Sequence, residues 1–406
     1  MKKSFAFLLY YLLMQSASAQ QAYHEITLPE LMKKFQQDKS NIVIVDVRSD
    51  GEYYDSASRF KSGNIGRIKG VQHIDVSELM KGPENVKPLE QFKDKEVYLI
   101  CSHSYRSRTA SNILLQNGFR NVNNVQGGMT EWYRRYEDLT PYRNELETSV
   151  RYTNISAAQL FGLYQKNGEF QLIGINIIPR YFYDSANQRL LNIFPSFKKS
   201  IYFNTGDSAK ILEYAKKNSG RPIILFSGYS YGAAEMADYL ASQGIPNVQY
   251  LVGGINYYVE YISNKNLMAE AAPSLVTKNS IRFISAGYFC DLMANKYKTV
   301  IIDLRHDTLF NKVNDGIKND YIHLKNSINF PYGRGSAEFE KAFPDKAPQY
   351  ILVSRFGPEG IELADELAKK GYLINWLLGG IARYDWYTIN DETFHCSDLL
   401  IRPATR

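Results

Sequence analysis

Cysteine and histidine are scarce in this chain of 406 residues, which contains three cysteines and six histidines. Three cysteines without a Cys-x-x-Cys pair exclude a disulfide-dense scaffold and a cysteine-rich zinc or iron–sulfur site. The histidines form no His-Glu-x-x-His motif, so no metal site is predicted. The sequence also lacks the Gly-x4-Gly-Lys-Ser/Thr loop that binds nucleotide phosphates.

A strong charge of either sign is missing as well. Forty-eight Lys and Arg residues against 42 Asp and Glu residues give a net charge of +6. This excess is too small for a nucleic-acid-binding or membrane-binding surface, so neither partner is predicted. With 44% hydrophobic and 22% charged residues, the chain is expected to be globular, and its length predicts more than one core.

The N-terminus has the pattern of a secretory signal peptide. Lys2 and Lys3 precede the apolar run 5–14, and the small residues 17–19 follow it. The alternative is a membrane anchor, but a bilayer-spanning helix needs about 20 apolar residues. We therefore expect residues 1–19 to be removed, leaving a periplasmic or secreted protein without a membrane span.

Most of the remaining chain consists of three equally spaced segments that share one plan. Each opens with a hydroxyl residue before a short amphipathic helix, namely Thr27, Ser156 and Ser285. An aliphatic run typical of a buried parallel strand follows, at 42–46, 172–178 and 300–303. A later strand leads through a turn into an Ala-rich helix that ends at Gly118, Gly244 or Gly371. A last strand ends at a glycine pair, at 127–128, 253–254 and 379–380.

This alternation of strands and helices predicts three tandem α/β domains, each a parallel sheet flanked by helices. Polar stretches place the boundaries. We expect domains at 20–145, 150–265 and 278–390, followed by a C-terminal tail at 391–406.

The turn after the strand 97–100 in the first copy carries the candidate chemistry. It begins with Cys101, and Arg106 follows after four intervening residues. Inward-pointing N–H groups and the N-terminus of the next helix create a cradle for an anion, which favours the thiolate form of Cys101. The guanidinium of Arg106 adds a permanent positive charge. A thiolate in such a cradle indicates nucleophilic chemistry on an anionic group.

This turn resembles the active site of the rhodanese family of sulfurtransferases, which reads Cys, four residues, Arg, then Ser or Ala. The resemblance extends over the first copy, and the third copy keeps one signature; the matching stretches are 46–48, 52–53, 66–74, 127–128 with Trp132, and 323–331. Two departures stand out. The family often has Gly where Ser104 stands, which predicts a strained or differently wound backbone, and residues 55–64 look like an insertion.

The resemblance implies a persulfide mechanism. Related phosphatases have five residues between Cys and Arg, whereas the four residues here suit a terminal sulfur. Cys101 would accept sulfane sulfur from a small anionic donor such as thiosulfate and pass it to a thiol or cyanide, without any other cofactor. Arg106 would be catalytic, and the turn residues would bind substrate, namely Ser102, His103, Ser104, Tyr105 and Ser107. The alternatives are an inert buried cysteine and a solvent-facing His103.

The second and third copies lack the thiol. Ser227 and Ser354 stand where Cys101 does, while Gly232 and Glu359 replace the arginine. We therefore expect both copies to be non-catalytic and to serve as a scaffold or to hold a protein partner. The opposing hypothesis for the whole chain is a rhodanese-like binding protein without transfer activity.

Two further features leave alternatives open. The stretch 228–232 fits the Gly-x-Ser-x-Gly nucleophile elbow around Ser230, but no oxyanion segment precedes it, so a serine hydrolase is disfavoured. Cys290 lies in the opening helix of the third copy and Cys396 lies in the tail. A bond between them would pin the tail and leave Cys101 as the free thiol, whereas the alternative for Cys290 is a small buried hydrophobe.

Overall fold

The computed structural model describes residues 23–175, 196–228, 232–276, 280–295, 298–311, 322–356, 359–390, 394 and 396–402. The expected signal peptide, Ser230 and part of the tail lie outside these residues. By its internal contacts, the chain forms two compact units. Unit 1 comprises Met1–Ser56, Gly66–Glu131 and Asp138–Thr148. Unit 2 comprises Ala57–Ile65, Trp132–Glu137 and Ser149–Arg406. The three-domain division stays a prediction.

The core of unit 1 is a five-stranded sheet in which all neighbouring strands are parallel. Its strands, in spatial order, are β1 (His24–Thr27), β6 (Val122–Gln126), β5 (Glu96–Ile100), β2 (Ile42–Asp46) and β4 (Gln72–His73). A two-stranded antiparallel sheet pairs β3 (Arg67–Ile68) with β7 (Leu146–Glu147). The main α-helices are α2 (Leu28–Gln37), α3 (Asp50–Tyr53), α4 (Val76–Leu79) and α5 (Tyr105–Gln116).

Short helical segments also lie within residues 61–145. They are η1 (Lys61–Gly63), η2 (Pro83–Phe92), η3 (Gly128–Thr130), α6 (Glu131–Arg134), α7 (Tyr136–Leu139) and η4 (Thr140–Glu145). The sheet of unit 1 is covered on both faces because its strands are apolar on both sides. Val43 and Val45 of β2 pack in one cluster with Leu114 of α5, and Ile44 between them points to the opposite face.

Unit 2 contains a second parallel sheet with the same order of strands. Its strands are β8 (Thr153–Ile155), β13 (Val248–Leu251), β12 (Ile223–Phe226), β9 (Gln171–Ile175) and β11 (Ser200–Phe203). The helices are α8 (Ala157–Gln165), η7 (Thr205–Asp207), α9 (Ser208–Lys217), α10 (Ala233–Ser242), α11 (Gly254–Asn264) and α12 (Met268–Ala271). Strands β10 (Ser196–Phe197) and β14 (Leu275–Val276) pair in antiparallel fashion.

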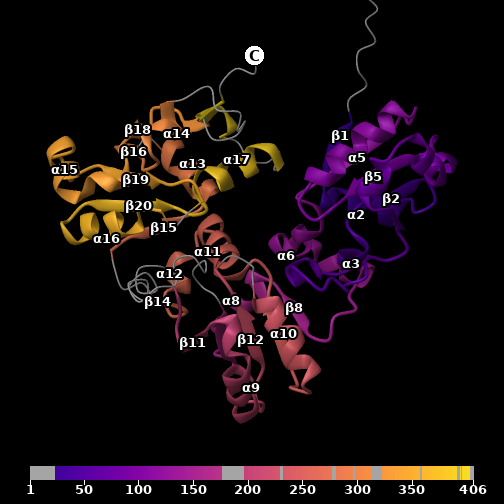
Figure 1. Cartoon of the computed structure of the whole chain (residues 1–406), viewed down its shortest axis with the longest axis horizontal. Helices are drawn as coiled ribbons and strands as arrows, with labels where there is room; N and C mark the ends of the chain where they lie inside the picture. The colour runs from indigo at the N-terminus through magenta and orange to yellow at the C-terminus, as the bar shows by residue number, and fades with distance from the viewer. Residues whose placement is uncertain are drawn as a thin grey trace, which may run out of the picture. The chain divides into compact units, whose positions relative to one another are not determined.

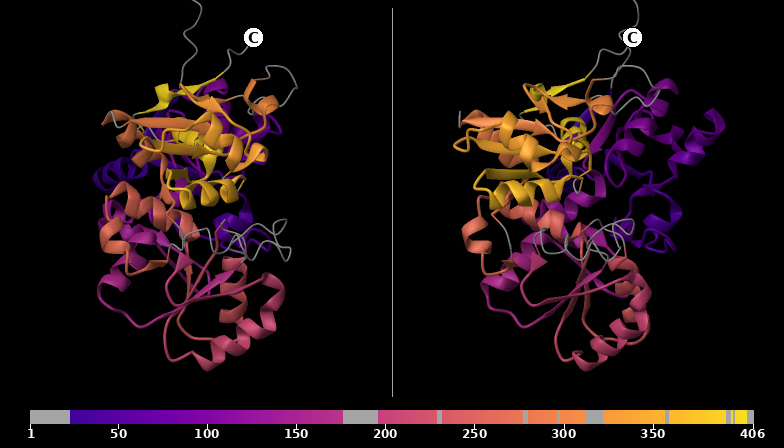
Figure 2. Two further views of the ribbon diagram at one scale, coloured as in Figure 1. Left: turned by 90° about the vertical axis from the view of Figure 1, so that its left-hand side faces the viewer. Right: turned by 60° about the vertical axis from the view of Figure 1, so that its left-hand side comes forward.

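A third parallel sheet, also in unit 2, repeats the order again. Its strands are β15 (Arg282–Ile284), β20 (Leu373–Leu377), β19 (Gln349–Val353), β16 (Thr299–Asp303) and β18 (Ile328–Asn329). The helices are α13 (Ala286–Ala294), α14 (Asp307–Asn311), η8 (Tyr332–Arg334), α15 (Gly335–Ala342), α16 (Ile361–Lys369), α17 (Gly380–Asn390) and η9 (Ser397–Leu399). Strand β17 (His323–Leu324) pairs with β21 (Leu400–Ile401). Figures 1 and 2 show helices on both faces of each sheet in unit 2. The predicted α/β class with several parallel sheets is confirmed.

The three expected helix starts are found where the hydroxyl residues stand. Thr27 caps α2 and Ser156 caps α8 through capping boxes with Glu30 and Gln159. Ser285 accepts a hydrogen bond from the Tyr288 N–H at the start of α13. Each cap satisfies N–H groups that have no partner inside the helix.

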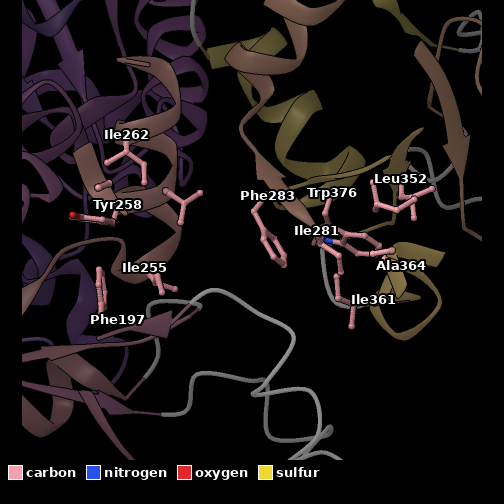
Figure 3. Packing of buried hydrophobic residues seen from close by; sticks show 14 of the residues in the cluster. Phe197, Ile255, Tyr258, Ile262, Ile281, Phe283, Leu352, Ile361, Ala364 and Trp376 are labelled. Atoms are coloured by element: carbon pink, nitrogen blue, oxygen red, sulfur yellow. The ribbon is translucent and has the colours of Figure 1, made fainter. Parts of the chain in front are cut away.

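The second and third sheets share one hydrophobic core in unit 2. Helix α11 packs Tyr258 and Ile262 into the same cluster as Phe283 of β15. Figure 3 shows this cluster continuing to Trp376 of β20 and the residues around it. Because this apolar surface is shared, we expect the second and third sheets to depend on each other for stability.

A disulfide joins Cys290 of α13 to Cys396, with 5.9 Å between their α-carbons. Tyr384 of α17 donates a hydrogen bond to the Cys396 carbonyl oxygen at 2.6 Å. The bond fastens the described part of the tail to the third sheet and confirms the pairing that the sequence left open. Cys101 is the one free cysteine. Among the helices of the described residues, none has the length and apolarity that crossing a membrane requires.

Candidate active site

The expected reactive turn connects β5 to α5, and Cys101 is its first residue. The Cys101 side chain is 1% exposed and continues the inward alternation of Val97 and Leu99, with which it shares a hydrophobic cluster. Ser107, in the first turn of α5, places its Oγ 3.4 Å from the sulfur and 3.0 Å from the Ser104 carbonyl oxygen. The thiol therefore lies below the surface, beside a hydroxyl group and the helix N-terminus.

The backbone that follows β6, from the glycine pair 127–128 to Thr130, packs against this turn. The Met129 N–H donates to the Cys101 carbonyl oxygen at 2.7 Å, and the Thr130 N–H and Oγ1 donate to the Ser102 carbonyl oxygen at 3.3 and 3.1 Å. Gly128 has a φ of 61°, and a Cβ there would lie 2.1 Å from the Cys101 carbonyl oxygen. Only glycine allows the two backbone segments to approach so closely.

Ser104 has the left-handed backbone conformation that the sequence comparison anticipated. Its φ is 76°, in the region that glycine favours. Its fully buried hydroxyl accepts a hydrogen bond from the Gly127 N–H at 2.7 Å and donates one to the Val125 carbonyl oxygen at 3.2 Å. The side chain thus points into the fold, where its hydrogen bonds offset the backbone cost.

Arg106 is held by Glu52, which was not among the predicted site residues. The guanidinium Nη1 and Nη2 donate to the two Glu52 carboxylate oxygens at 2.5 and 2.7 Å. Ser102 Oγ donates to Glu52 at 2.7 Å and accepts from Arg106 Nη2 at 2.8 Å. The arginine therefore belongs to a closed network of charged and hydroxyl groups.

Glu52 is also held by Ser49, at the start of its own helix α3. It closes a capping box at the start of α3, where its carboxylate accepts hydrogen bonds from the Ser49 N–H and hydroxyl. Burial raises the pKa of Glu52, but the hydrogen bonds and charge of Arg106, with the hydroxyls of Ser102 and Ser49, outweigh it and lower the pKa to about 2. The pKa of Arg106 rises because the Glu52 carboxylate outweighs the effect of burial. Both groups stay ionised at neutral pH. The spacing Ser49-x-x-Glu52 is the sequence signal that could have located this carboxylate.

The other two turn residues face outward. His103 is exposed, and the Tyr105 side chain is 81% exposed. The structure thus brings Cys101, Ser102, Arg106 and Ser107 to the same turn, places His103 and Tyr105 at its rim, and directs Ser104 away into the core.

The second and third sheets contain turns with the same backbone support. The backbone carbonyl oxygens of Ser227 and Ser354 accept hydrogen bonds from the N–H groups of Ile255 and Ile381 at 3.1 and 2.9 Å, as the Cys101 carbonyl oxygen does from Met129. A Cβ on Gly254 or Gly380 would collide with the carbonyl oxygen of the respective serine. Both serines are buried, at 0% and 1% exposure. Each serine therefore follows a central strand directly and accepts the same kind of backbone hydrogen bond as Cys101.

Comparison with known proteins identifies the first copy. The profile of the rhodanese-like domain matches residues 27–135. A putative sulfurtransferase of Bacillus subtilis is 32% identical over 108 residues, which cover 27% of this chain and 88% of that protein. A thiosulfate sulfurtransferase of Pseudoalteromonas translucida is 23% identical over 117 residues, covering 29% of this chain and 95% of that protein.

A longer relative matches over a stretch of similar length. A tRNA uridine(34) hydroxylase of Cytophaga hutchinsonii is 30% identical over 99 residues, which cover 24% of this chain. The chain spans 28% of the length of that hydroxylase. The shared part is thus a single domain, and the match over most of the Bacillus subtilis protein shows that this chain belongs to the rhodanese-like family.

Proposed function

We propose that the protein is an exported sulfurtransferase that carries sulfane sulfur on Cys101. The observation that supports this most directly is the single free thiol, Cys101, which begins the turn between β5 and α5, where the family has its Cys-x4-Arg motif. Relatives that match the first copy are named as sulfurtransferases. With thiosulfate, the Cys101 thiolate would attack the outer sulfur, the sulfur–sulfur bond would break, and sulfite would leave with the bonding electrons. A thiol or cyanide would then attack the terminal sulfur of the persulfide and release the thiolate.

The roles of the neighbouring residues follow from their positions. Arg106 and the N-terminus of α5 would stabilise the anionic sulfur, and Ser107 Oγ would contact it from the helix side. Ser102 would orient Arg106 through their 2.8 Å hydrogen bond. His103 and Tyr105 would meet the donor or acceptor at the rim.

The second and third sheets would be degenerate rhodanese-like domains. The repeated order of strands and the shared backbone support of their turns favour this origin. Serine in place of the thiol would leave them without transfer activity, so that they serve as a scaffold or bind a protein partner. We propose domain limits of 20–145, 150–265 and 278–390.

Export is supported by two independent features. The first 19 residues have the signal-peptide pattern. The disulfide between Cys290 and Cys396 fits an oxidising compartment, because disulfides rarely persist in a reducing cytosol. The measured mass of the mature chain from its native host tests this proposal, since cleavage after Ala19 removes a defined mass.

A rhodanese-like binding protein without transfer activity is the second candidate. The observations that favour it are the 1% exposure of Cys101 and the pairing of Arg106 with Glu52. Mass spectrometry after incubation with a sulfur donor separates the two. Transfer predicts the mass of one added sulfur atom on the peptide that contains Cys101 and no addition in Cys101→Ser, whereas an unmodified Cys101 would support the binding protein.

A further inference from the structure

The backbone that supports the Cys101 turn continues along the chain into a set of contacts inside unit 2. The Met129 N–H donates to the Cys101 carbonyl oxygen at 2.7 Å. The Thr130 N–H donates to the Ser102 carbonyl oxygen at 3.3 Å. Helix α6 begins at the next residue, and residues 132–137 belong to unit 2 by their contacts. Whatever holds α6 inside unit 2 therefore also restrains the backbone that supports the turn.

Glu260 of α11 holds the end of α6. Arg134, the last residue of α6, donates to one Glu260 carboxylate oxygen from Nε at 3.1 Å and from Nη2 at 2.9 Å. Arg383 of α17 donates to the other carboxylate oxygen at 3.2 Å. Both arginines also donate to the Tyr387 hydroxyl, at 3.3 and 3.4 Å. One carboxylate thus joins α6 to α11 and α17.

Burial makes this contact a firm one. The side chains of Arg134 and Glu260 are only 9% and 13% exposed. Burial raises the pKa of Glu260, but the charges of Arg134 and Arg383 outweigh it and lower the pKa to about 2. Glu260 is therefore ionised at neutral pH. Loss of its charge would leave the two guanidinium groups without their shared partner, and an uncompensated buried charge is costly.

A second contact holds the same segment three residues after Arg134. Glu137 accepts a hydrogen bond from the Tyr261 hydroxyl at 3.0 Å and pairs with Lys265 at 2.7 Å. Tyr261 lies in α11, and Lys265 follows the last residue of that helix. The side chains of Glu137 and Lys265 are about half exposed, so water screens this pair and it contributes less than the buried one.

The spacing of the repeat places these contacts at matched positions. Arg134, Glu260 and Trp386 each stand six positions after the second glycine of the pair that follows β6, β13 or β20. The three residues meet in one cluster, because the Arg134 guanidinium that pairs with Glu260 also lies 5.2 Å from the centre of the Trp386 ring. The helices that follow the glycine pairs thus share one set of contacts, and α6 is the member that leads back to the turn with the free thiol.

We propose, on the basis of the proposed transfer function, that Glu260 is a positioning residue for the reaction at Cys101. By fixing Arg134 it holds the end of α6, and the backbone just before α6 keeps the carbonyl oxygens of Cys101 and Ser102 in place. Ser102 in turn orients Arg106 through its 2.8 Å hydrogen bond. The second and third sheets, which have serine where the thiol would stand, thereby help to order the reactive turn of the first sheet.

Labelling of the Cys101 thiol in the folded protein measures the order of the turn. The thiol is buried and is the one free cysteine, so N-ethylmaleimide reacts with it only when the turn opens. The labelling rate is measured without denaturant, well below the thermal transition, for the full-length protein, for Glu260→Gln and for Glu340→Gln. Glu340 is the matched control, because it is a carboxylate of unit 2 that Lys346 and Lys370 share at 3.6 and 2.5 Å.

We expect Glu260→Gln to raise the labelling rate by about tenfold, because the release of Arg134 makes opening of the turn easier. On the same proteins, kcat/KM for sulfur transfer from thiosulfate to cyanide should fall by about tenfold in Glu260→Gln, because displacement of the reacting groups slows the reaction. Glu340→Gln should change neither quantity. A role of Glu260 confined to the stability of unit 2 would leave the labelling rate of Cys101 unchanged, so this rate separates positioning from stability.

A second variant provides the test if Glu260→Gln does not fold. Arg134→Met keeps a long side chain at the end of α6 and leaves Glu260 paired with Arg383, and it should raise the labelling rate of Cys101 to a similar extent. A labelling rate equal to that of the unmodified protein in either folded variant would refute the inference and leave the transfer function standing. Failure of thiosulfate to load sulfur onto Cys101 of the unmodified protein would refute the transfer function and, with it, the role of Glu260 in the reaction.

Discussion

Ser104 offers a direct measurement of how the active-site turn is stabilised. Two substitutions separate the energetic cost of its backbone conformation from the contribution of its hydroxyl group. Ser104→Gly removes the cost of the left-handed φ of 76° together with the hydroxyl, and Ser104→Ala removes the hydroxyl but keeps the cost. A comparison based on φ alone predicts that Ser104→Gly stabilises the protein.

The hydrogen bonds of Ser104 reverse that expectation. A left-handed conformation costs a residue with a side chain about 1 kcal/mol. Loss of the hydroxyl leaves the buried Gly127 N–H without the acceptor that now lies 2.7 Å away, and an unpaired buried donor costs about 1–3 kcal/mol. The hydrogen bond to the Val125 carbonyl oxygen is lost too. We expect Ser104→Ala to destabilise unit 1 by about 2 kcal/mol and Ser104→Gly by about 1 kcal/mol.

Labelling of the Cys101 thiol provides the assay. Cys101 is buried, and the other two cysteines are joined in a disulfide, so a short pulse of maleimide in increasing urea reports the unfolding of unit 1 alone. At a slope of about 2 kcal/mol per molar urea, Ser104→Ala should lower the midpoint by about 1 M and Ser104→Gly by about half as much. A midpoint for Ser104→Gly above that of the unmodified protein would show that backbone strain outweighs the two hydrogen bonds and would refute the reasoning.

Three further predictions use the other charged and sulfur-containing sites. The pKa of Glu52 is about 2 in the folded protein against an ordinary value of 4.5, so the ionised carboxylate stabilises the fold by about 3 kcal/mol above pH 4.5. This stabilisation is lost as the pH falls through 2. In acid, the urea midpoint of unit 1 should therefore depend less on pH in Glu52→Gln than in the unmodified protein. Glu260→Gln should destabilise unit 2 by about 3 kcal/mol in thermal unfolding, because Arg134 and Arg383 share that carboxylate at 2.9 and 3.2 Å, and an unchanged transition would contradict this. Thiol counting on unreduced, denatured protein should find one free thiol, Cys101, whereas three would contradict the disulfide.

Local features of the fold were predictable from sequence because short-range chemistry determines them. The side chains of Thr27, Ser156 and Ser285 each cap a helix by accepting a hydrogen bond from the N–H group three residues later. The run 42–46 is apolar enough to be read directly as the buried strand β2. The same pattern of residues recurs twice later in the chain and predicted further sheets of the same kind. The second and third sheets have the same order of strands as the first.

Contacts between distant segments were not predictable in the same way. Arg106 was expected to meet an anionic substrate, and in the structure it meets Glu52, which lies more than fifty residues earlier in the chain. Sequence spacing shows that both residues exist but not that their side chains converge. Residues 55–64 were expected to be an insertion, and that stays a prediction. The contacts of Lys61 within unit 2, where its N–H donates to Glu235 and its ammonium pairs with Asp238, could not be anticipated.

One family signature is better explained by folding than by catalysis. After β2 of the first sheet, Arg48 pairs with Asp46 at 2.7 Å and donates to the Gly66 carbonyl oxygen at 2.8 Å, with both charged side chains buried. The third sheet has the same arrangement after β16, where Arg305 pairs with Asp303 at 2.6 Å and donates to a carbonyl oxygen at 2.8 Å.

In the third sheet, Ser354 and not a cysteine follows β19, so the ion pair is present beside a residue that cannot form a persulfide. Removing one partner of a buried ion pair costs about 3–5 kcal/mol, which is a sufficient reason to keep both in either sheet. The pair anchors the end of the second strand to the loop that precedes the third. The turn after β5 brings Cys101 and Arg106 together with the carboxylate of Glu52, whereas the chain after β19 has Ser354 in place of a thiol.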